Sequence, residues 1–254
     1  MRSLIQTIRS RMTTATAPKK LYLFQLSTTA IPLPGGQNLE MSSGCYLVET
    51  TDNKRILIDS GMASDAPRSP APPSNEKNVV EHLAELDIRP QDIDILICTH
   101  FDVDHAGYHD AFTDSEFIVQ REHYTLARNG HPRFAAARPH WDHPALRYRL
   151  IDGDTELLPG MTLLETSGHA PGHQSVLVRL PQAGPILLAI DAAVLQRTFT
   201  VDRKAWPTDD NEQQLRASTK KLLDLVEREQ IKLVVFGHDG HQWKSLKKSP
   251  EFYD

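Results

Sequence analysis

Cysteine is scarce in this sequence, which has only Cys45 and Cys98 among 254 residues. The two lie far apart, so nothing indicates the disulfide framework that staples small secreted domains. Two buried thiols in a reducing compartment are the simpler interpretation. We therefore expect a cytoplasmic protein.

Long apolar runs and an excess of basic charge are also missing. No uninterrupted apolar stretch approaches the roughly 18 residues that cross a bilayer, so we expect no membrane partner. The formal net charge is −5, and binding to nucleic acid needs a clustered basic surface. A small-molecule substrate is the expected partner, and the oligomeric state stays open, a homodimer included.

The composition itself is that of an ordinary globular chain. Hydrophobic residues make up 39% and charged residues 24%, and the length suffices to bury a core. Residues 1–19 contain four basic residues and no acidic one, which would suit a targeting peptide, but they lack a continuous apolar stretch. We expect a flexible N-terminal extension there, followed by a single domain over residues 20–254.

Short apolar runs alternate with helical patterns, which predicts an α/β domain. The predicted strands are 21–26, 45–49, 55–59, 93–98, 117–119, 161–165, 175–180, 186–190 and 232–236. Helices are predicted over 75–86, capped by Ser74, and around 215–226. The arginine-rich segment 128–147 has little periodicity, which predicts a surface excursion that covers the substrate. Its four arginines favour an anionic substrate or form a solvated charged surface.

Twelve histidines are present, and some of them cluster with carboxylates. His100, Asp102, Asp104 and His105 all follow the predicted strand 93–98 directly. Residues two apart in an extended backbone point to the same side, so His100 and Asp102 can face one metal ion. A turn after them can direct Asp104 and His105 to a neighbouring position, and zinc binds both imidazole and carboxylate.

Three further candidates, His169, Asp191 and His238, each follow the end of a predicted strand, the usual place for sites on α/β folds. An isolated histidine at a strand end is more often structural than a ligand. We keep that structural interpretation for the histidines outside the set, namely His82, His109, His123, His131, His140, His143 and His241. Packing does not explain four strand ends that each deliver a histidine or an aspartate.

The segment 100–105 resembles the HxHxDH motif of the metallo-β-lactamase superfamily, and the spacing to His169, Asp191 and His238 continues the match. Within that superfamily the chain most resembles the N-acyl homoserine lactonases. The similar segments are 117–121, 151–154, 159–160, 168–175, 190–192 and 236–239, and the resemblance covers most of residues 20–240. It implies an αββα sandwich, with two mixed β-sheets flanked by helices and metals at one edge.

The resemblance also implies roles for the candidate residues. His100, Asp102 and His169 would hold one divalent ion, Asp104, His105 and His238 a second, Asp191 would bridge both, and His173 would orient ligands without binding metal. Zinc is the implied metal. The implied reaction opens a small lactone ring, most closely that of an N-acyl homoserine lactone, by attack of a hydroxide between the ions. Asp104 is the candidate to accept and return the proton.

Two departures from the family pattern bear on this expectation. Asp102 stands where the motif has its second histidine, which lowers the formal charge of the centre by one unit. We expect a higher pKa for the attacking water and a shift of preference from zinc toward manganese, iron or cobalt.

The second departure is Val194, which stands where the lactonases have a tyrosine three residues after the bridging aspartate. The sequence offers four candidate replacements without choosing among them: Tyr46, Tyr108, Tyr124 and Tyr148. It assigns no substrate-binding residue. Two alternatives therefore stay open. One is hydrolysis of another ester, a thioester or a phosphotriester at the same centre, and the other is a non-catalytic metal-binding or sensing protein.

Overall fold

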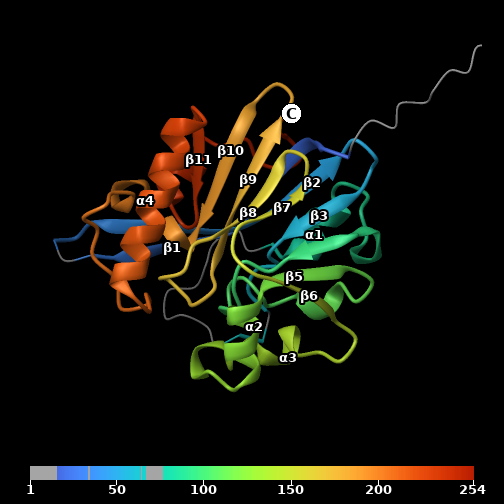
Figure 1. Ribbon diagram of the computed structural model, residues 1–254, viewed down its shortest axis with the longest axis horizontal. Coiled ribbons are helices and arrows are strands. Elements are labelled where there is room, and N and C mark those ends of the chain that lie inside the picture. The colour runs from blue at the N-terminus through green and yellow to red at the C-terminus, as the bar shows by residue number, and fades with distance from the viewer. Residues whose placement is uncertain (1–15, 34, 64, 67–76) are drawn as a thin grey trace, which may run out of the picture.

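The structure, a computed structural model, describes residues 16–33, 35–63, 65–66 and 77–254. Most of the expected N-terminal extension and the expected helix cap Ser74 lie outside these residues. The chain forms two sheets (Figure 1). The first has the order β1 (Pro18–Pro32), β2 (Asn38–Thr50), β3 (Arg55–Ile58), β4 (Ile95–Ile97), β5 (Glu116–Gln120) and β6 (Arg147–Ile151). The second has the order β11 (Leu233–Phe236), β10 (Gly184–Ile190), β9 (Gln174–Leu180), β8 (Met161–Glu165) and β7 (Thr155–Leu158).

Both sheets are mixed. In the first, β1, β2 and β3 pair antiparallel, whereas β3, β4, β5 and β6 pair parallel. In the second, β10 pairs parallel with β11 and antiparallel with β9. The alternating direction of side chains along a strand places apolar residues on both faces of each sheet. On β2, Tyr46 and Val48 belong to the cluster between the sheets, and Cys45 and Leu47 to the cluster on the outer face.

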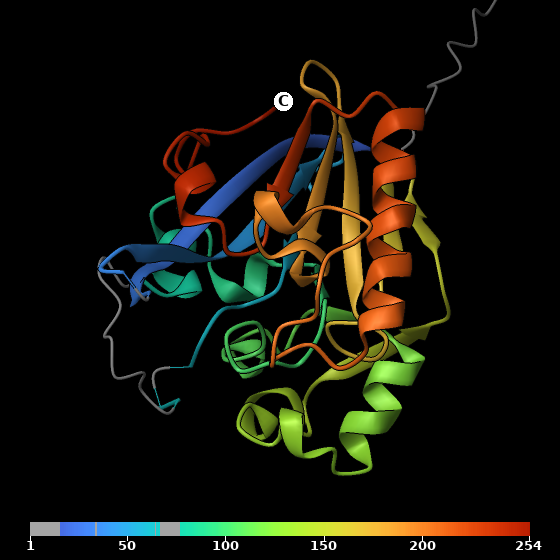
Figure 2. The ribbon, with the colours of Figure 1, turned by 90° about the vertical axis from the view of Figure 1, so that its left-hand side faces the viewer.

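Helices cover both outer faces. The helices are α1 (Val79–Ala84), α2 (Arg121–Arg128), α3 (Arg138–Trp141), α4 (Glu212–Arg228) and α5 (Gly240–Trp243), with 3₁₀ turns η1 (Pro90–Asp92), η2 (His109–Ala111), η3 (Pro132–Phe134), η4 (Asp191–Ala193) and η5 (Gln196–Thr198). Figure 2 shows α4 lying along the second sheet, where Leu222 and Leu225 pack on Leu177 and Leu187. Val79 and Leu83 of α1 pack on the first sheet. The expected αββα sandwich is confirmed. Among the described residues no helix is both long and apolar enough to span a membrane.

Two predictions about local structure were incomplete or wrong. The first helix begins later than predicted: Asn78 caps it, because its side chain accepts a hydrogen bond from Glu81 N while the Glu81 carboxylate accepts one from Asn78 N. Strands β6 and β7 were not predicted, because both lie at sheet edges and carry polar or charged side chains between apolar ones.

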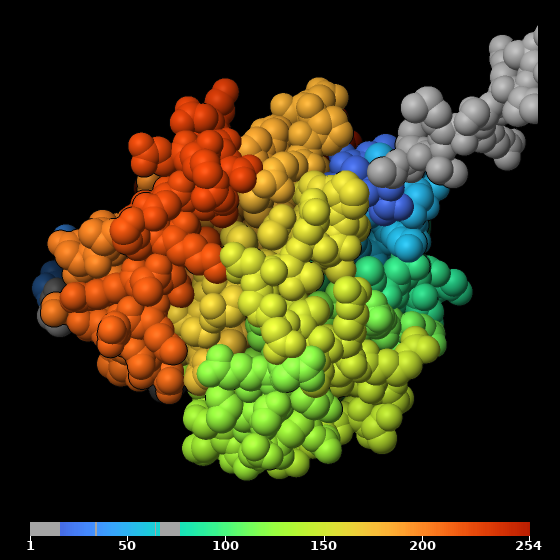
Figure 3. Space-filling model, in the orientation of Figure 1, coloured from blue at the N-terminus to red at the C-terminus, as the bar shows by residue number. Residues whose placement is uncertain are grey.

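The segment 128–147 is more than a surface excursion. It contains η3 and α3, and Phe134 and Trp141 are fully buried against Phe101. In Figure 3 the segment, in green and yellow-green, forms the lower part of this face, next to α4. Its two buried aromatic side chains fix its position relative to the loop that follows β4.

Candidate metal centre

The seven predicted ligands converge at one edge of the sandwich. Four lie in the loop after β4, and one each follows β8, β10 and β11: His100, Asp102, Asp104, His105, His169, Asp191 and His238. Their side chains form overlapping groups in which the ligand atoms lie within 4.8 Å of one another. We call His100, Asp102 and His169 the first ligand group, and Asp104, His105 and His238 the second ligand group.

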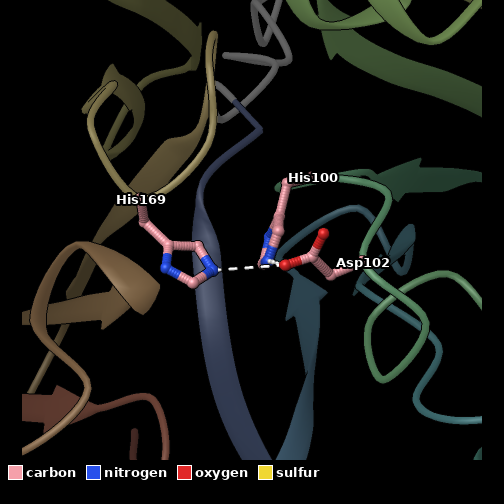
Figure 4. Close-up of side chains that lie close together, drawn as sticks. All are labelled: His100, Asp102 and His169. Carbon is pink, nitrogen blue, oxygen red and sulfur yellow. Dashed lines mark hydrogen bonds and ion pairs between the residues drawn. The ribbon is translucent and has the colours of Figure 1, made fainter. Parts of the chain in front are cut away.

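The first ligand group joins two loops from different sheets, as Figure 4 shows. Asp102 Oδ2 lies 3.5 Å from His100 Nε2 and 3.3 Å from His169 Nε2. His100 is fully buried, and the Asp102 side chain keeps 18% of its surface exposed. The group is therefore compact and open to solvent only on the carboxylate side.

The second ligand group is similarly close. Asp104 Oδ2 lies 3.8 Å from His105 Nε2 and 3.6 Å from His238 Nε2. The side chain of Asp104 is 26% exposed, the largest exposure in the cluster. A carboxylate at the rim can exchange protons with a substrate, whereas the two imidazoles are held inside.

Asp191 lies between the two groups. Its Oδ1 is 3.6 Å from His105 Nε2 and 3.1 Å from His238 Nε2. Its Oδ2 is 3.3 Å from His169 Nε2 and 4.0 Å from His100 Nε2. Oδ2 also lies 3.3 Å from His238 Nε2, so the carboxylate contacts imidazoles of both groups and stands where it could bridge two ions.

Each of the four imidazoles has an acceptor outside the cluster. The Nδ1 contacts are His100 to Thr99 Oγ1 (3.0 Å), His105 to Asp59 Oδ2 (2.9 Å), His169 to Asp209 Oδ1 (2.8 Å) and His238 to Ser42 O (3.0 Å). Because the Thr99 hydroxyl donates to Asp59, it accepts from His100. In the neutral form of each ring the network therefore assigns the proton to Nδ1 and turns the Nε2 lone pair toward the cluster. Metal-binding histidines are typically held in this way.

The donor set fits divalent cations. Three buried atoms that face the cluster, His100 Nε2, His105 Nε2 and Asp191 Oδ1, have no hydrogen-bond partner, and such atoms are costly unless something else satisfies them. Burial lowers the pKa of His105, but Asp104, Asp191 and Asp59 together raise it to about 10. Burial likewise opposes the charge on His169, yet Asp191 and Asp102 raise its pKa to about 9. The carboxylates thus favour positive charge here, and a divalent ion supplies it while using the free lone pairs.

The backbone at Asp191 is specially shaped. The preceding residue, Ile190, has φ 51°, which is unfavourable for a β-branched side chain. Gly237 lies opposite, and a Cβ there would come within 2.6 Å of Asp191 Oδ1. This loop therefore needs glycine at position 237 to leave room for the bridging carboxylate.

Asp59 and Asp209 of the site were not predicted, and Arg133 was predicted only as one of four arginines that favour an anionic substrate or form a solvated surface. Asp59 is fully buried and holds His105 and both the backbone N–H and the hydroxyl of Thr99. A signal for Asp59 existed, since it also ends a strand and precedes a turn. Asp209 and Arg133 lie in irregular segments, where no periodicity or motif marks them.

Several histidines given a structural interpretation have hydrogen-bond partners within the protein, among them His82, His109, His123 and His140. His123 Nε2 accepts from Phe101 N at 2.8 Å, and His123 Nδ1 donates to Pro171 O at 2.7 Å, so it links the loops of His100 and His169. His109 is buried beside the Ser60 hydroxyl. His173 Nε2 accepts from Asp191 N at 3.2 Å, so His173 positions the backbone of the bridging residue.

The four arginines of segment 128–147 do not act together. Arg128 and Arg138 both pair with Asp142, and Arg147 donates to the backbone of Asp114. Only Arg133 reaches the cluster. The expectation that all four favour an anionic substrate is therefore not supported by their positions.

The tyrosine candidates are mostly engaged elsewhere. Tyr46 is buried beside Trp243 between the sheets, and the Tyr148 hydroxyl donates to Trp141 O. Tyr124 packs on the Tyr148 ring. Val194 itself is buried, and no tyrosine hydroxyl hydrogen-bonds to the described ligands.

Comparisons with known proteins show which family the chain resembles. The pattern of the Metallo-beta-lactamase superfamily matches residues 40–238. An N-acyl homoserine lactonase from Bacillus sp. is 33% identical over 92% of this chain and 98% of its own length. N-acyl homoserine lactonase AttM from Azorhizobium caulinodans is 36% identical over 70% of each chain.

A solved structure is also similar. It is described as an N-acyl homoserine lactone hydrolase with the product N-hexanoyl-L-homoserine bound at the catalytic metal centre. It is 31% identical, with a TM-score of 0.81, and the match covers 93% of this chain and all of the other. With the fold, the ligand cluster and these relatives in agreement, the chain belongs to the metallo-β-lactamase superfamily.

Proposed function

We propose that this metal-dependent hydrolase opens the lactone ring of N-acyl homoserine lactones. The observation that carries the proposal is the cluster of four imidazoles and three carboxylates, with every Nε2 turned inward. Relatives that span nearly the whole chain are named for this activity. The likeness extends to a structure with the ring-opened product at its metal centre.

Divalent metal ions are the cofactors of this centre, and we propose that there are two. The first ligand group would hold one ion, the second ligand group the other, and Asp191 both. When bound, the ions supply a more acidic water and polarise the ester carbonyl. Zinc is the metal of choice for this donor set, with manganese, iron or cobalt favoured more than in an all-histidine first group because of Asp102.

The protein's own residues then move the proton. The Asp104 carboxylate lies at the rim of the cluster, where it can take the proton of the attacking water. As the bond between the carbonyl carbon and the ring oxygen breaks, Asp104 returns the proton to that oxygen. The products balance as one N-acyl homoserine for each lactone and water consumed.

The test is a panel of lactones with different acyl chains, assayed with protein reconstituted separately with zinc, manganese, iron and cobalt. Ring opening is measured by mass spectrometry of the product. We expect turnover with at least one metal and none after chelation. Metal-loaded protein that leaves every lactone intact would refute the proposal.

A second candidate function is hydrolysis of another ester, a thioester or a phosphotriester. Val194 supports it, because the tyrosine hydroxyl expected to assist lactone opening is missing at this position. Thioesters, other esters and phosphotriesters therefore belong in the same panel. Turnover of one of these without lactones would move the assignment to that substrate. A protein that binds metal and is inert to all would be a binding or sensing member. We propose the cytoplasm as its location, since Cys45 and Cys98 are both free thiols.

A further inference from the structure

Arg133 makes direct contact with the first ligand group. Its Nε donates to Asp102 Oδ1 at 2.7 Å, and its Nη2 donates to Asp102 Oδ2 at 2.5 Å. The same Nη2 lies 2.8 Å from His169 Nε2. One nitrogen of the guanidinium thus contacts two of the atoms that a metal ion in the first ligand group would need.

The guanidinium is firmly held in this place. Its Nη1 donates to the backbone carbonyls of His169 and Thr208, both at 2.7 Å. Together with the contacts to Asp102 and His169 Nε2, all five N–H groups of the side chain are used. The next residue, Phe134, is fully buried and fixes the backbone from which Arg133 extends.

The second ligand group has no such neighbour. Among the described residues, no arginine or lysine forms an ion pair with Asp104 or Asp191. A cation next to only one group must weaken metal binding there, because it repels a second cation and because Nη2 and the ion compete for the same lone pairs.

We propose that Arg133 competes with a divalent ion for Asp102 and His169, so that the centre loads in order. The second ligand group binds first and tightly, and the first ligand group binds later and more weakly. This inference rests on the proposed metal centre. It also gives Asp102 a role that the family's histidine could not have. Arginine can chelate a carboxylate with two hydrogen bonds, whereas it cannot chelate an imidazole.

The experiment titrates zinc into the metal-free full-length protein in competition with a chromophoric chelator. The wild type should show two binding events with dissociation constants that differ by roughly tenfold or more, since charge-assisted hydrogen bonds must be broken for the weaker one. Arg133→Met should tighten the weaker event by a similar factor and leave the tighter one unchanged. Arg133→Lys, which keeps the charge without the fork, should lie between them.

Three controls make the result specific. Arg121→Met removes a surface arginine that pairs with exposed Asp152 and should change neither event. His169→Ala should abolish the weaker event and His238→Ala the tighter one. Circular dichroism verifies that each variant is folded, and if Arg133→Met is not, Arg133→Lys carries the test.

Two equal binding events in the wild type, or no change in any folded Arg133 variant, would overturn the proposal. The lactone panel gives an independent answer. If lactones are hydrolysed and the two metal affinities are equal, the role of Arg133 is rejected and the proposed function stands. If the two affinities differ and no lactone is hydrolysed, the role of Arg133 stands and the proposed function is rejected.

Discussion

The two ligand groups of the centre are built alike but neutralised differently. In both, imidazoles present Nε2 inward and donate Nδ1 outward to a fixed acceptor. Each group also has one carboxylate, Asp102 in the first and Asp104 in the second, but only Asp102 is chelated by a guanidinium, that of Arg133. Burial opposes the charge on Asp102, yet hydrogen bonds from Arg133 and His100 hold its pKa well below the usual range.

A ligand substitution need not change the charge of a site. Asp102 by itself would lower the formal charge of the centre, as the sequence suggested. Arg133 restores it, from a segment 31 residues further along the chain. We therefore expect the charge of Arg133 to oppose the predicted rise in the pKa of the attacking water.

The largest effect is expected at Asp191, the residue that both ligand groups share. Asp191→Ala should lower kcat/KM by on the order of 10³-fold or more, because the metal contribution amounts to several kcal/mol. Metal content measured by mass spectrometry should fall in parallel. Asp224→Ala on the exposed face of α4 is the control. A variant that keeps both its metal and its activity would show that the groups do not depend on this bridge.

Substituting the carboxylates that hold the histidine Nδ1 atoms should weaken metal binding at one ligand group more than at the other. Asp59→Asn should weaken zinc binding by the second ligand group roughly 10- to 100-fold, because losing the outer partner of a metal-binding histidine typically costs that much. Asp209→Asn should instead weaken binding at the first ligand group, because one Asp209 oxygen holds His169 Nδ1 while the other accepts from Trp206 N. The chelator titration measures both. Equal losses at both groups from either variant would contradict the distinction.

The smallest effect is expected on the pH dependence of stability, and it comes from His123, which links the loops of His100 and His169. Burial is the main cause that lowers the pKa of His123 to about 3, below its unfolded value of about 6.5. Its contribution to stability is thus present above pH 6.5 and lost as the pH falls toward 3, because the unfolded chain then binds more protons.

Urea unfolding at pH 7, 6 and 5 measures this contribution. His123→Gln should flatten the decline in unfolding free energy by up to about 1.4 kcal/mol per pH unit. His143→Gln, at an exposed position, should leave the slope unchanged. An unaltered slope in the His123 variant would assign the acid sensitivity to other groups.

Much of this protein was determined by local sequence. Strands such as β4 are short apolar runs bounded by polar residues, so both their presence and the position of His100 after them could be predicted. The HxHxDH-like segment and the strand ends at His169, Asp191 and His238 predicted for the same reason the side chains that the fold brings together. A side chain directly after a buried strand has little freedom in where it can lie.

Tertiary structure alone decided what surrounds those ligands. Asp209 contacts His169 across 40 residues, and Arg133 contacts Asp102 only because Phe134 and Trp141 bury the segment between α2 and β6. Irregular segments have no period from which a partner can be inferred. Their place is set by which aromatic side chains find room in the core, and that depends on packing between elements distant in the chain.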